Sequence, residues 1–261
     1  MRSRLWGVLA VYLLAFLGVV AFSVVAAAAL KAANPDVPDP ELFDGLPGLL
    51  AGGLASSAAL ALTVVAVTRP LNAQRLRLQP GRETGRDLAA AIVGTLALGQ
   101  ALDSLVTLAG LGQHGALAVI RRALEGADGP ALFAAVVIIG ILAGGAEEVF
   151  FRGWMQTRLR EHWPPGRAVV VTSLLFGLMH LEWLHAALAL ALGLWLGFVT
   201  EQTGSALPAL AAHVINNAVF TLLTATAGTV TGRDPNALLA LASAAVFLAC
   251  LRRLRGLGRA G

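Results

Sequence analysis

Three short motifs in this chain combine residue types that could perform acid–base chemistry. They read GGAEEVFFR at residues 144–152, FGLMH at 176–180 and HVINN at 213–217. A carboxylate can take a proton from water, whereas an imidazole or an amide can hold that water or stabilise a developing negative charge. Because each motif lies in an otherwise apolar stretch, where a charged group is costly, each predicts a functional position inside a membrane.

Helical spacing assigns different tasks to the two adjacent carboxylates. Glu148 and Arg152 are four residues apart and therefore share a helix face, in the order that favours an ion pair. Glu147 is rotated by about 100° from Glu148, so it points into a different space. We therefore predict that Glu148 is the charge partner of Arg152 and that Glu147 faces a polar cavity as a base. In the alternative, all three side chains simply reach to the membrane interface.

The other two motifs supply candidates for the partners of Glu147. His213 and Asn217 are four residues apart and present an imidazole and an amide on one face, and His180 ends the second motif. Together with a carboxylate, these groups can bind a divalent metal or position a water directly. A single buried histidine more often forms a hydrogen bond between helices, but the coincidence with Glu147 favours a shared site. The H-E-x-x-H signature of soluble metalloproteases is absent.

Two further polar residues fall within apolar stretches. His185 follows His180 by five residues, about 140° around a helix, so the two are not expected to share a site if that helix is continuous. Asp103 has no obvious partner in the sequence, so both a role in the cavity and a packing contact remain open.

The composition predicts the element type that must position these residues. Hydrophobic residues make up 57% of the 261 residues and charged residues only 13%, which is far from the balance of a water-soluble domain. Apolar runs of about 20 residues can each cross a bilayer as a helix. We predict an all-α, polytopic transmembrane bundle forming a single membrane-embedded domain over residues 1–261. The only cysteine, Cys250, excludes an intrachain disulfide and is expected to pack as a small hydrophobe.

The apolar pattern predicts about eight transmembrane helices. The first is too long for the apolar core of a cleaved signal peptide. The fifth and sixth are short, so seven spans or a re-entrant pair remain open. A short amphipathic helix at the membrane surface is expected at 116–125, and a solvated connector at 34–44. The expected helices cover residues 5–30, 47–68, 87–111, 130–158, 167–182, 185–200, 205–227 and 236–251.

The basic residues predict the orientation. If the N-terminus is cytoplasmic, fourteen of the nineteen Lys and Arg residues fall on the cytoplasmic side and four on the outer side, with Arg152 set apart inside a helix. This asymmetry favours a multi-pass protein of the cell membrane, plasma or inner, with both termini cytoplasmic. It also explains the net charge of +4 without a nucleic-acid partner. The fourteen are Arg2, Arg4, Arg69, Arg75, Arg77, Arg82, Arg86, Arg158, Arg160, Arg167, Arg252, Arg253, Arg255 and Arg259.

The depths of Glu147, His213 and His180 in the membrane agree only in part with a shared site. If Arg152 marks the cytoplasmic edge, Glu147 lies about 8 Å inside it, and His213 lies about 12 Å beyond Ser205. His180 is thirteen residues, about 20 Å, from Arg167, and is therefore deeper than the other two.

The motifs EEVFFR, FGLMH and HVINN resemble the EExxxR, FxxxH and HxxxN motifs of the CAAX protease and bacteriocin-processing family of intramembrane proteases. Each motif alone is weak, but the three in this order form a specific combination. They span residues 147–217, within a family-like core expected at about 130–227. The chain before residue 140 resembles nothing specific.

The resemblance implies a bundle of about eight transmembrane helices with a cavity open to the cytoplasmic side, and hydrolysis of peptide bonds near that face. In eukaryotic relatives the reaction removes the last three residues of a prenylated protein. By the same resemblance, Glu147 would activate the attacking water with help from His180, while His213 and Asn217 would stabilise the oxyanion. Glu148 and Arg152 would orient and electrostatically support this site.

The resemblance and the polar residues inside the apolar stretches together give the expected cofactor, partners and alternative functions. The assignment as a metalloprotease follows family convention, and Glu147, His180, His213 and Asn217 suit either a divalent metal such as zinc or a metal-free glutamate mechanism. The expected partners are the lipid bilayer and a peptide or lipidated protein substrate, with no nucleic acid and with the oligomeric state left open. A non-catalytic scaffold or immunity protein of the same fold is the alternative. A proton-coupled transporter is a weaker one, because no inverted repeat is visible.

Overall fold

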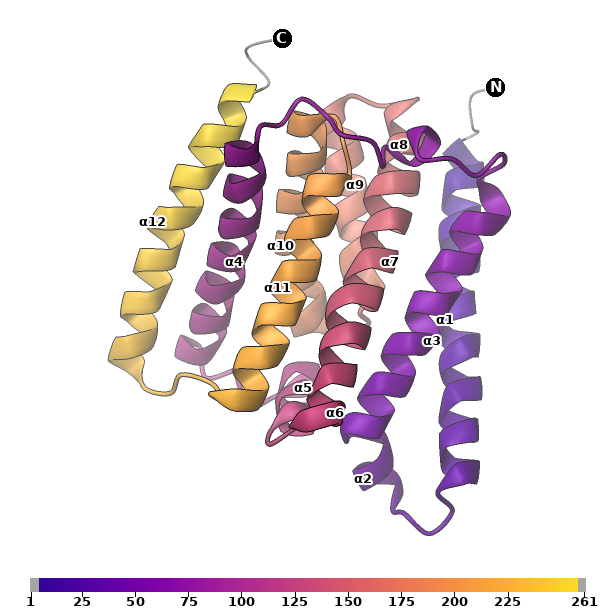
Figure 1. Cartoon of the computed structure of the whole chain (residues 1–261), viewed down its shortest axis with the longest axis vertical. Helices are drawn as coiled ribbons and strands as arrows, with labels where there is room; N and C mark the ends of the chain where they lie inside the picture. The colour runs from indigo at the N-terminus through magenta and orange to yellow at the C-terminus, as the bar shows by residue number, and fades with distance from the viewer. Residues whose placement is uncertain (1–4, 258–261) are drawn as a thin grey trace.

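The computed structural model describes residues 5–257, and within that range all regular structure is helical. Seven helices are long and apolar enough to cross a membrane, and α9 (Pro165–Leu178) is a shorter apolar helix. The predicted polytopic bundle is therefore confirmed (Figure 1). The seven are α1 (Leu5–Ala33), α3 (Leu46–Val67), α4 (Gly85–Leu108), the span Gly129–Arg160, α10 (Trp183–Thr203), α11 (Leu207–Thr226) and α12 (Arg233–Leu257).

The predicted helix boundaries agree with the structure to within three residues, except at the last helix, which ends at Leu257 and not at residue 251, and at three other places. The connector at 34–44 contains the short helix α2 (Asp39–Phe43), and the loop before α4 contains the 3₁₀ turn η1 (Gln74–Leu76). The fifth helix ends four residues earlier than predicted, at Leu178. At fourteen residues α9 is about 21 Å long, shorter than a hydrocarbon core of about 30 Å, so its lower end lies inside the bundle.

A tight turn separates α9 from α10. Leu181 adopts a left-handed conformation, with φ of 62°, which ends the first helix. The Glu182 carboxylate then accepts hydrogen bonds from the backbone N–H groups of Leu184 and His185, at 3.0 and 2.9 Å, and so caps the start of α10. The chain reverses direction in four residues, which brings the end of α9 against the start of α10.

The span Gly129–Arg160 is one continuous helix whose winding changes along its length. Two π-helical segments flank a single α-helical turn that carries both motif glutamates. Because π-helical turns are rare and occur often at functional sites, their position next to this turn is informative. The segments are α6 (Gly129–Ala135), η2 (Val136–Ala143, π), α7 (Gly144–Glu148), η3 (Val149–Gln156, π) and α8 (Thr157–Arg160).

The helices form a bundle with two outer pairs around a central group (Figure 1). Helix α1 packs along α3 on one side, and α4 packs along α12 on the other. Between the pairs, α11 lies against η2 and α7, and α9 packs against α10. One buried apolar core joins α1, α3, η3 and α9, and a second joins α4, α10, α11 and α12. The site lies between these two cores.

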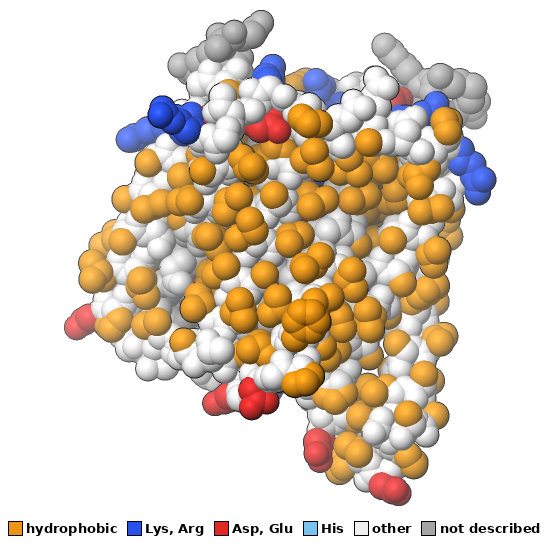
Figure 2. All heavy atoms as spheres, in the orientation of Figure 1, with side chains coloured by type: hydrophobic (Ala, Val, Ile, Leu, Met, Phe, Trp, Pro, Cys, Tyr) orange, Lys and Arg blue, Asp and Glu red, His pale blue; other side chains and the backbone are white. Residues whose placement is uncertain are grey.

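Charged residues separate towards the two ends of the bundle. The beginning of α1 and the end of α12 lie at the same end, and Figure 2 shows Lys and Arg side chains gathered there, with most acidic side chains at the opposite end. This distribution agrees with the positive-inside pattern, although the orientation in the membrane stays a prediction. Three of the arginines counted for it, Arg2, Arg4 and Arg259, lie outside the described residues.

The predicted amphipathic helix at 116–125 is present as α5 (Gly115–Leu124). It lies at the end of the bundle opposite the termini, where it contacts α3, α10 and α11 (Figure 1). Helix α5 therefore fills the space below the short helix α9 and the α9–α10 turn.

Candidate active site

The three motifs meet at one cavity of about 410 Å³. Its walls come from α3, α4, α5, the span Gly129–Arg160, α9, α10 and α11. Most of the lining is apolar, which is typical of pockets that bind small or extended ligands. Four of the six predicted site residues line it: Glu147, His180, His213 and Asn217. The other two, Glu148 and Arg152, are completely buried behind the wall.

Glu148 pairs with Arg152, as the spacing predicted. Arg152 Nη1 donates to Glu148 Oε1 at 2.7 Å, and both side chains have no exposed surface. The alternative, in which these residues reach the membrane interface, is therefore wrong for this pair. The same carboxylate oxygen accepts a hydrogen bond from His213 Nδ1 at 2.8 Å. Removing one member of such a group would leave a buried charge without its partner, at a typical cost of about 3–5 kcal/mol.

Arg152 begins a row of polar contacts between the span Gly129–Arg160 and α10. Arg152 Nη2 donates to the backbone oxygen of Gly193 at 3.1 Å, and one turn later Gln156 Nε2 donates to that of Gly197 at 3.1 Å. A β-carbon at Gly193 would lie 3.3 Å from Arg152 Nη2, so the small residue admits the guanidinium. The row fixes the height of the two helices relative to each other.

His213 lies between the two glutamates. Its Nδ1 is bonded to Glu148, and its Nε2 lies 3.8 Å from Glu147 Oε2. Because an ionised carboxylate only accepts hydrogen bonds, Glu148 assigns the ring hydrogen to Nδ1 and leaves Nε2 directed towards Glu147. The second carboxylate of the motif therefore orients the imidazole that faces the first.

His180 is held in a similar way. Its Nδ1 lies 2.9 Å from the backbone oxygen of Phe176, which makes Nδ1 the donor and leaves Nε2 unprotonated in the neutral ring. The Phe176 ring meets the rings of His180 and His213 edge-on, with centroids 5.0 and 6.0 Å away. The Arg152 guanidinium lies over the same phenyl ring, 4.7 Å from its centroid. Phe176 therefore spaces the two histidines apart.

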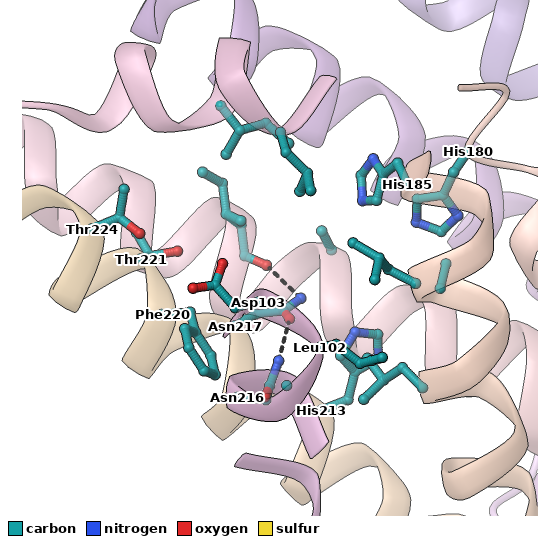
Figure 3. Close-up of a pocket in the computed structure, with 18 of the residues that line it drawn as sticks. Leu102, Asp103, His180, His185, His213, Asn216, Asn217, Phe220, Thr221 and Thr224 are labelled. Atoms are coloured by element: carbon teal, nitrogen blue, oxygen red, sulfur yellow. Dashed lines mark hydrogen bonds between the residues drawn. The ribbon is translucent and has the colours of Figure 1, made fainter. Parts of the chain in front are cut away.

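His180 and His185 lie together, in contrast to the prediction made for a continuous helix. Their ring centroids are 4.4 Å apart, and both residues line the cavity, as Figure 3 shows. The prediction assumed one continuous helix, whereas the turn at Leu181 starts a new one. Glu182, an acidic residue immediately before the apolar run of α10, caps the start of that helix. Its position in the sequence indicated that one helix ends and another begins there.

Asn217 connects the cavity to the π-helical segment η2. Its Nδ2 donates to the backbone oxygen of Ile139 at 3.4 Å, and its Oδ1 accepts from Asn216 Nδ2 at 3.3 Å (Figure 3). Two glycines of the span Gly129–Arg160 let α11 approach it closely. A β-carbon at Gly140 would lie 3.1 Å from Ala218, and one at Gly144 would lie 3.4 Å from Asn217 Nδ2.

Asp103 belongs to the cavity and has a partner that sequence reasoning missed. It lines the wall from α4 and forms an ion pair with Arg121 of α5. The two are far apart in sequence, so helical spacing alone does not connect them. An acidic residue within a membrane span does require a partner, and the arginines of the amphipathic segment are the next basic residues along the chain.

The depth assigned to Glu147 needs correction. Arg152 does not mark a membrane edge, because it is buried and its helix continues to Arg160. Glu147 is thirteen residues from Arg160, about 20 Å along the helix. His180 is also thirteen residues from Arg167, so Glu147 and His180 lie at the same depth. The predicted 8 Å was too shallow, and Glu147 lies near the middle of its span.

A metal does not fit the side chains as they are arranged. Among residues 5–257, no group of three or more His, Cys, Asp or Glu side chains is placed to hold an ion. Asn217, the fourth ligand suggested by the sequence, is bonded to Ile139 and Asn216.

Comparison with known proteins identifies the part of the chain that carries the motifs. Residues 129–219 match a family model described as type II CAAX prenyl endopeptidase Rce1-like. The match begins with the span Gly129–Arg160 and ends just after Asn217, so it omits Asp103 and Arg121. No curated protein and no solved structure matches the chain. The resemblance predicted from the three motifs is confirmed, because residues 129–219 carry the pattern of the Rce1-like, CAAX-type intramembrane proteases.

Proposed function

We propose that this protein is an intramembrane endopeptidase in which Glu147 activates the water that attacks a peptide bond. The observation that carries the proposal is the arrangement of His213, whose Nε2 lies 3.8 Å from Glu147 in the cavity while its Nδ1 is fixed by buried Glu148. A base, an oriented imidazole and a cavity that can hold the substrate are the components that such a reaction needs.

The proton balance runs through Glu147. The carboxylate takes a proton from water as the water oxygen attacks the carbonyl carbon of the scissile bond. When the carbon–nitrogen bond then breaks, the same proton passes to the leaving amine. Glu147 returns to its ionised form, and the products are a carboxylic acid and an amine. His180, with Nε2 unprotonated in its neutral ring, accepts a hydrogen bond from the water and so holds it in place.

His213 and Asn217 stabilise the oxyanion formed in this step. Asn217 Nδ2 carries two hydrogens, of which one is directed to Ile139, so the other can donate. His213 enters the step as an imidazolium between the carboxylates of Glu147 and Glu148 and keeps its proton throughout, so that Nε2 can donate to the oxyanion. Donors of this kind act more strongly in a mostly apolar cavity than in bulk water.

Glu148 and Arg152 are positioning residues in this proposal. They touch neither water nor substrate, because both are completely buried. Their pair holds the His213 ring and places a positive charge behind a site that contains two carboxylates. The electrostatic effect is large because few water dipoles screen it there.

The substrate class follows from the site being inside the membrane. A peptide reaches a cavity of this kind when it is already associated with the bilayer, so we propose membrane-bound or lipidated peptides as substrates. We also propose that the protein resides in the cell membrane with both termini cytoplasmic, on the basis of its charge distribution.

Purified protein in liposomes, incubated with a library of lipidated peptides, tests the proposal. Wild type should release fragments, and Glu147→Gln should lower the rate by at least about 100-fold, the smallest usual contribution of a general base. Glu41→Gln is the matched control, because Glu41 is exposed on α2, away from the cavity. Equal product from wild type and Glu147→Gln would overturn the assignment of Glu147, and no product from wild type across the library would overturn the protease assignment.

A chelator separates the two versions of the mechanism. Because the donor groups do not gather around one point, we expect activity to persist after prolonged dialysis against a strong zinc chelator. Elemental analysis of the dialysed protein checks that metal is gone. Loss of activity that returns when zinc is added would show that the metal-free version is wrong.

A further inference from the structure

His185 lines the cavity but belongs to none of the three motifs. Its ring lies beside that of His180, with the two centroids 4.4 Å apart and the ring planes at 61° (Figure 3). This edge-on contact is a favoured geometry for two aromatic rings. The proposed hydrolysis gives His180 the task of holding the water and gives His185 no task, although the two rings touch.

His180 lies beyond the end of its helix. Helix α9 ends at Leu178, and the left-handed residue Leu181 turns the chain away just after His180. Within the described residues, the His180 ring makes one hydrogen bond, from Nδ1 to the carbonyl oxygen of Phe176. The last torsion of a histidine side chain has broad minima, so this bond alone fixes the direction of Nε2 only in part.

The two aromatic rings in contact with His180 come from different helices. Phe176 belongs to α9 itself, four residues earlier, and moves together with His180. His185 belongs to α10, so its ring fixes His180 relative to a second helix. Helix α10 also receives a hydrogen bond from buried Arg152 at the backbone oxygen of Gly193. The contact through His185 therefore ties His180 to the same frame as the helix that carries the motif glutamates.

Backbone contacts on both sides of His185 place its ring. On one side, the Glu182 carboxylate accepts a hydrogen bond from the His185 backbone N–H at 2.9 Å. On the other side, Gly177 of α9 faces Ala186, where a β-carbon on the glycine would lie 2.7 Å from the Ala186 backbone oxygen. Only a residue without a side chain lets α10 approach α9 this closely, and the approach brings His185 to His180.

The His185 ring has no hydrogen-bond partner among residues 5–257, so its printed interactions there are electrostatic and the edge contact with His180. Because the ring also lines the cavity, a direct hydrogen bond to water or peptide is the other role open to it. The two roles need different parts of the side chain. A phenyl ring keeps the edge contact without the nitrogens, whereas a glutamine amide keeps a polar group without the ring.

We propose that His185 is a positioning residue for His180, whose imidazole it holds with Nε2 directed to the attacking water. This inference rests on the proposed function, because that function gives His180 its task. It adds to the site a residue outside the three motifs, placed by Gly177 and by the Glu182 cap.

Activity of full-length protein in liposomes, with the lipidated peptide library, gives the first test. His185→Ala should lower kcat about tenfold, the effect of losing one aromatic contact, and should leave KM within about twofold. His185→Phe should keep most of the wild-type kcat, and His185→Gln should behave like the alanine variant. His114→Ala is the matched control, because His114 is exposed and does not line the cavity.

Two results of this assay would overturn the inference and leave the protease in place. One is wild-type kcat in His185→Ala. The other is a glutamine variant more active than the phenylalanine variant, which would assign a direct hydrogen bond to His185. If wild type cleaves none of the peptides, the proposed function fails and the inference fails with it.

Nitrogen NMR of ring-labelled histidines measures the state of His180 without turnover. The spectra are recorded at alkaline pH, where the ring is neutral, and the His180 signals are identified by their loss in His180→Gln. Wild type should show one tautomer, with the hydrogen on Nδ1 facing the Phe176 carbonyl. His185→Ala should show both tautomers, and His185→Phe should show one. A single tautomer in His185→Ala would overturn the inference.

Gly177→Ala should reproduce the effect without changing either histidine. Because the new β-carbon would lie 2.7 Å from the Ala186 backbone oxygen, α10 must move away and take His185 with it. Gly166→Ala is the matched control on α9, because a β-carbon there has no neighbour within 4 Å. We expect both tautomers of His180 and a kcat about tenfold lower in Gly177→Ala, with wild-type values in the control. Wild-type kcat and a single tautomer in Gly177→Ala would contradict the proposal.

Discussion

Glu148 does more than pair with Arg152, the contact that their spacing in the sequence predicts. Its Oε1 accepts hydrogen bonds from both Arg152 and His213, and its Oε2 has no partner among the described residues. One buried carboxylate thus connects the first motif to the third. The HxxxN motif takes part in the site because this oxygen fixes the ring of its histidine.

Replacing Glu148 by glutamine should show whether Glu148 orients His213 or contributes to substrate binding. The substitution keeps the volume and one accepting oxygen, but removes the charge that orders His213 and neutralises Arg152. We expect kcat to fall by about 100-fold, within the range of general acid–base effects, while KM changes little. Steady-state kinetics across a pH series measures this. A variant that changes only KM, with an unaltered pH profile, would show that Glu148 has no part in ordering His213.

The π-helical segments and small residues determine where the glutamates point. Segment η2 contacts α3 and α11, and Gly140 lies in that contact. Each π-helical turn holds more residues than an α-helical one, so the face presented by α7 cannot be read from α-helical spacing across the whole span. The local spacing from Glu148 to Arg152 was sufficient to predict their contact, but not to predict which helix Glu147 would face.

Two glycines in this region should respond in opposite ways to alanine. At Gly140 the new β-carbon would lie 3.1 Å from both Cα and Cβ of Ala218, so α11 must shift. Gly145 has no neighbour within 4 Å at that position, so its alanine should be neutral or stabilising by up to about 1 kcal/mol. Thermal denaturation in detergent should rank Gly145→Ala at or above wild type and Gly140→Ala below it. The reverse order would contradict the close packing of η2 on α11.

Glu182 connects the α9–α10 turn to α5. Its carboxylate caps α10, and a β-carbon at Gly115 of α5 would lie 2.9 Å from its Cδ. Hydrogen bonds from the backbone N–H groups of Leu184 and His185 hold the pKa of Glu182 below its ordinary value of 4.5. One side chain therefore stabilises the turn that brings His180 and His185 together.

The lowered pKa predicts how this contribution depends on pH. Because the folded-state pKa lies below the unfolded value, the carboxylate stabilises the fold above about pH 4.5, and the effect is lost as pH falls through the folded-state pKa. Wild type should therefore melt at a higher temperature than Glu182→Gln at pH 7, and the difference should shrink as the pH falls below 4.5. Melting curves from pH 7 to pH 3 measure it. A difference that is constant over this range would exclude the ionised carboxylate as its cause.

On the scale of the whole molecule, the charge distribution and the position of the cavity together predict from which side a substrate reaches the site. The termini end is basic, whereas the lining of the cavity reaches α5 at the opposite end. If the termini are cytoplasmic, the site is reached from within the membrane or through the region of α5, and not through the buried contacts around Arg152. The resemblance to the family implied instead a cavity open to the cytoplasm. A measurement of the orientation of the protein in the membrane decides between these two routes of access.

Cysteine labelling tests the orientation directly, because the chain has a single cysteine. In a Cys250→Ser background, Asp36→Cys places a thiol at the end opposite the termini, and Gln79→Cys places one at the termini end. Both positions are exposed. A membrane-impermeant maleimide should label the first in intact cells and the second only after the membrane is opened. The opposite pattern would place both termini outside.

The sequence by itself determined the helices, the three motifs and the pairing of Glu148 with Arg152. Each of these depends on apolar length or on residues within one helical turn, and such local relations hold in whatever bundle the chain forms.

Only the tertiary structure decided the rest. The contact between His180 and His185 required the helix break at Leu181, and the pair of Asp103 with Arg121 required α5 to fold back under the bundle. The depth of Glu147 depended on Arg152 being buried, which in turn depends on Gly193 of α10, the small residue that admits the guanidinium. These relations join residues on different helices, and packing rather than periodicity sets the distance between them.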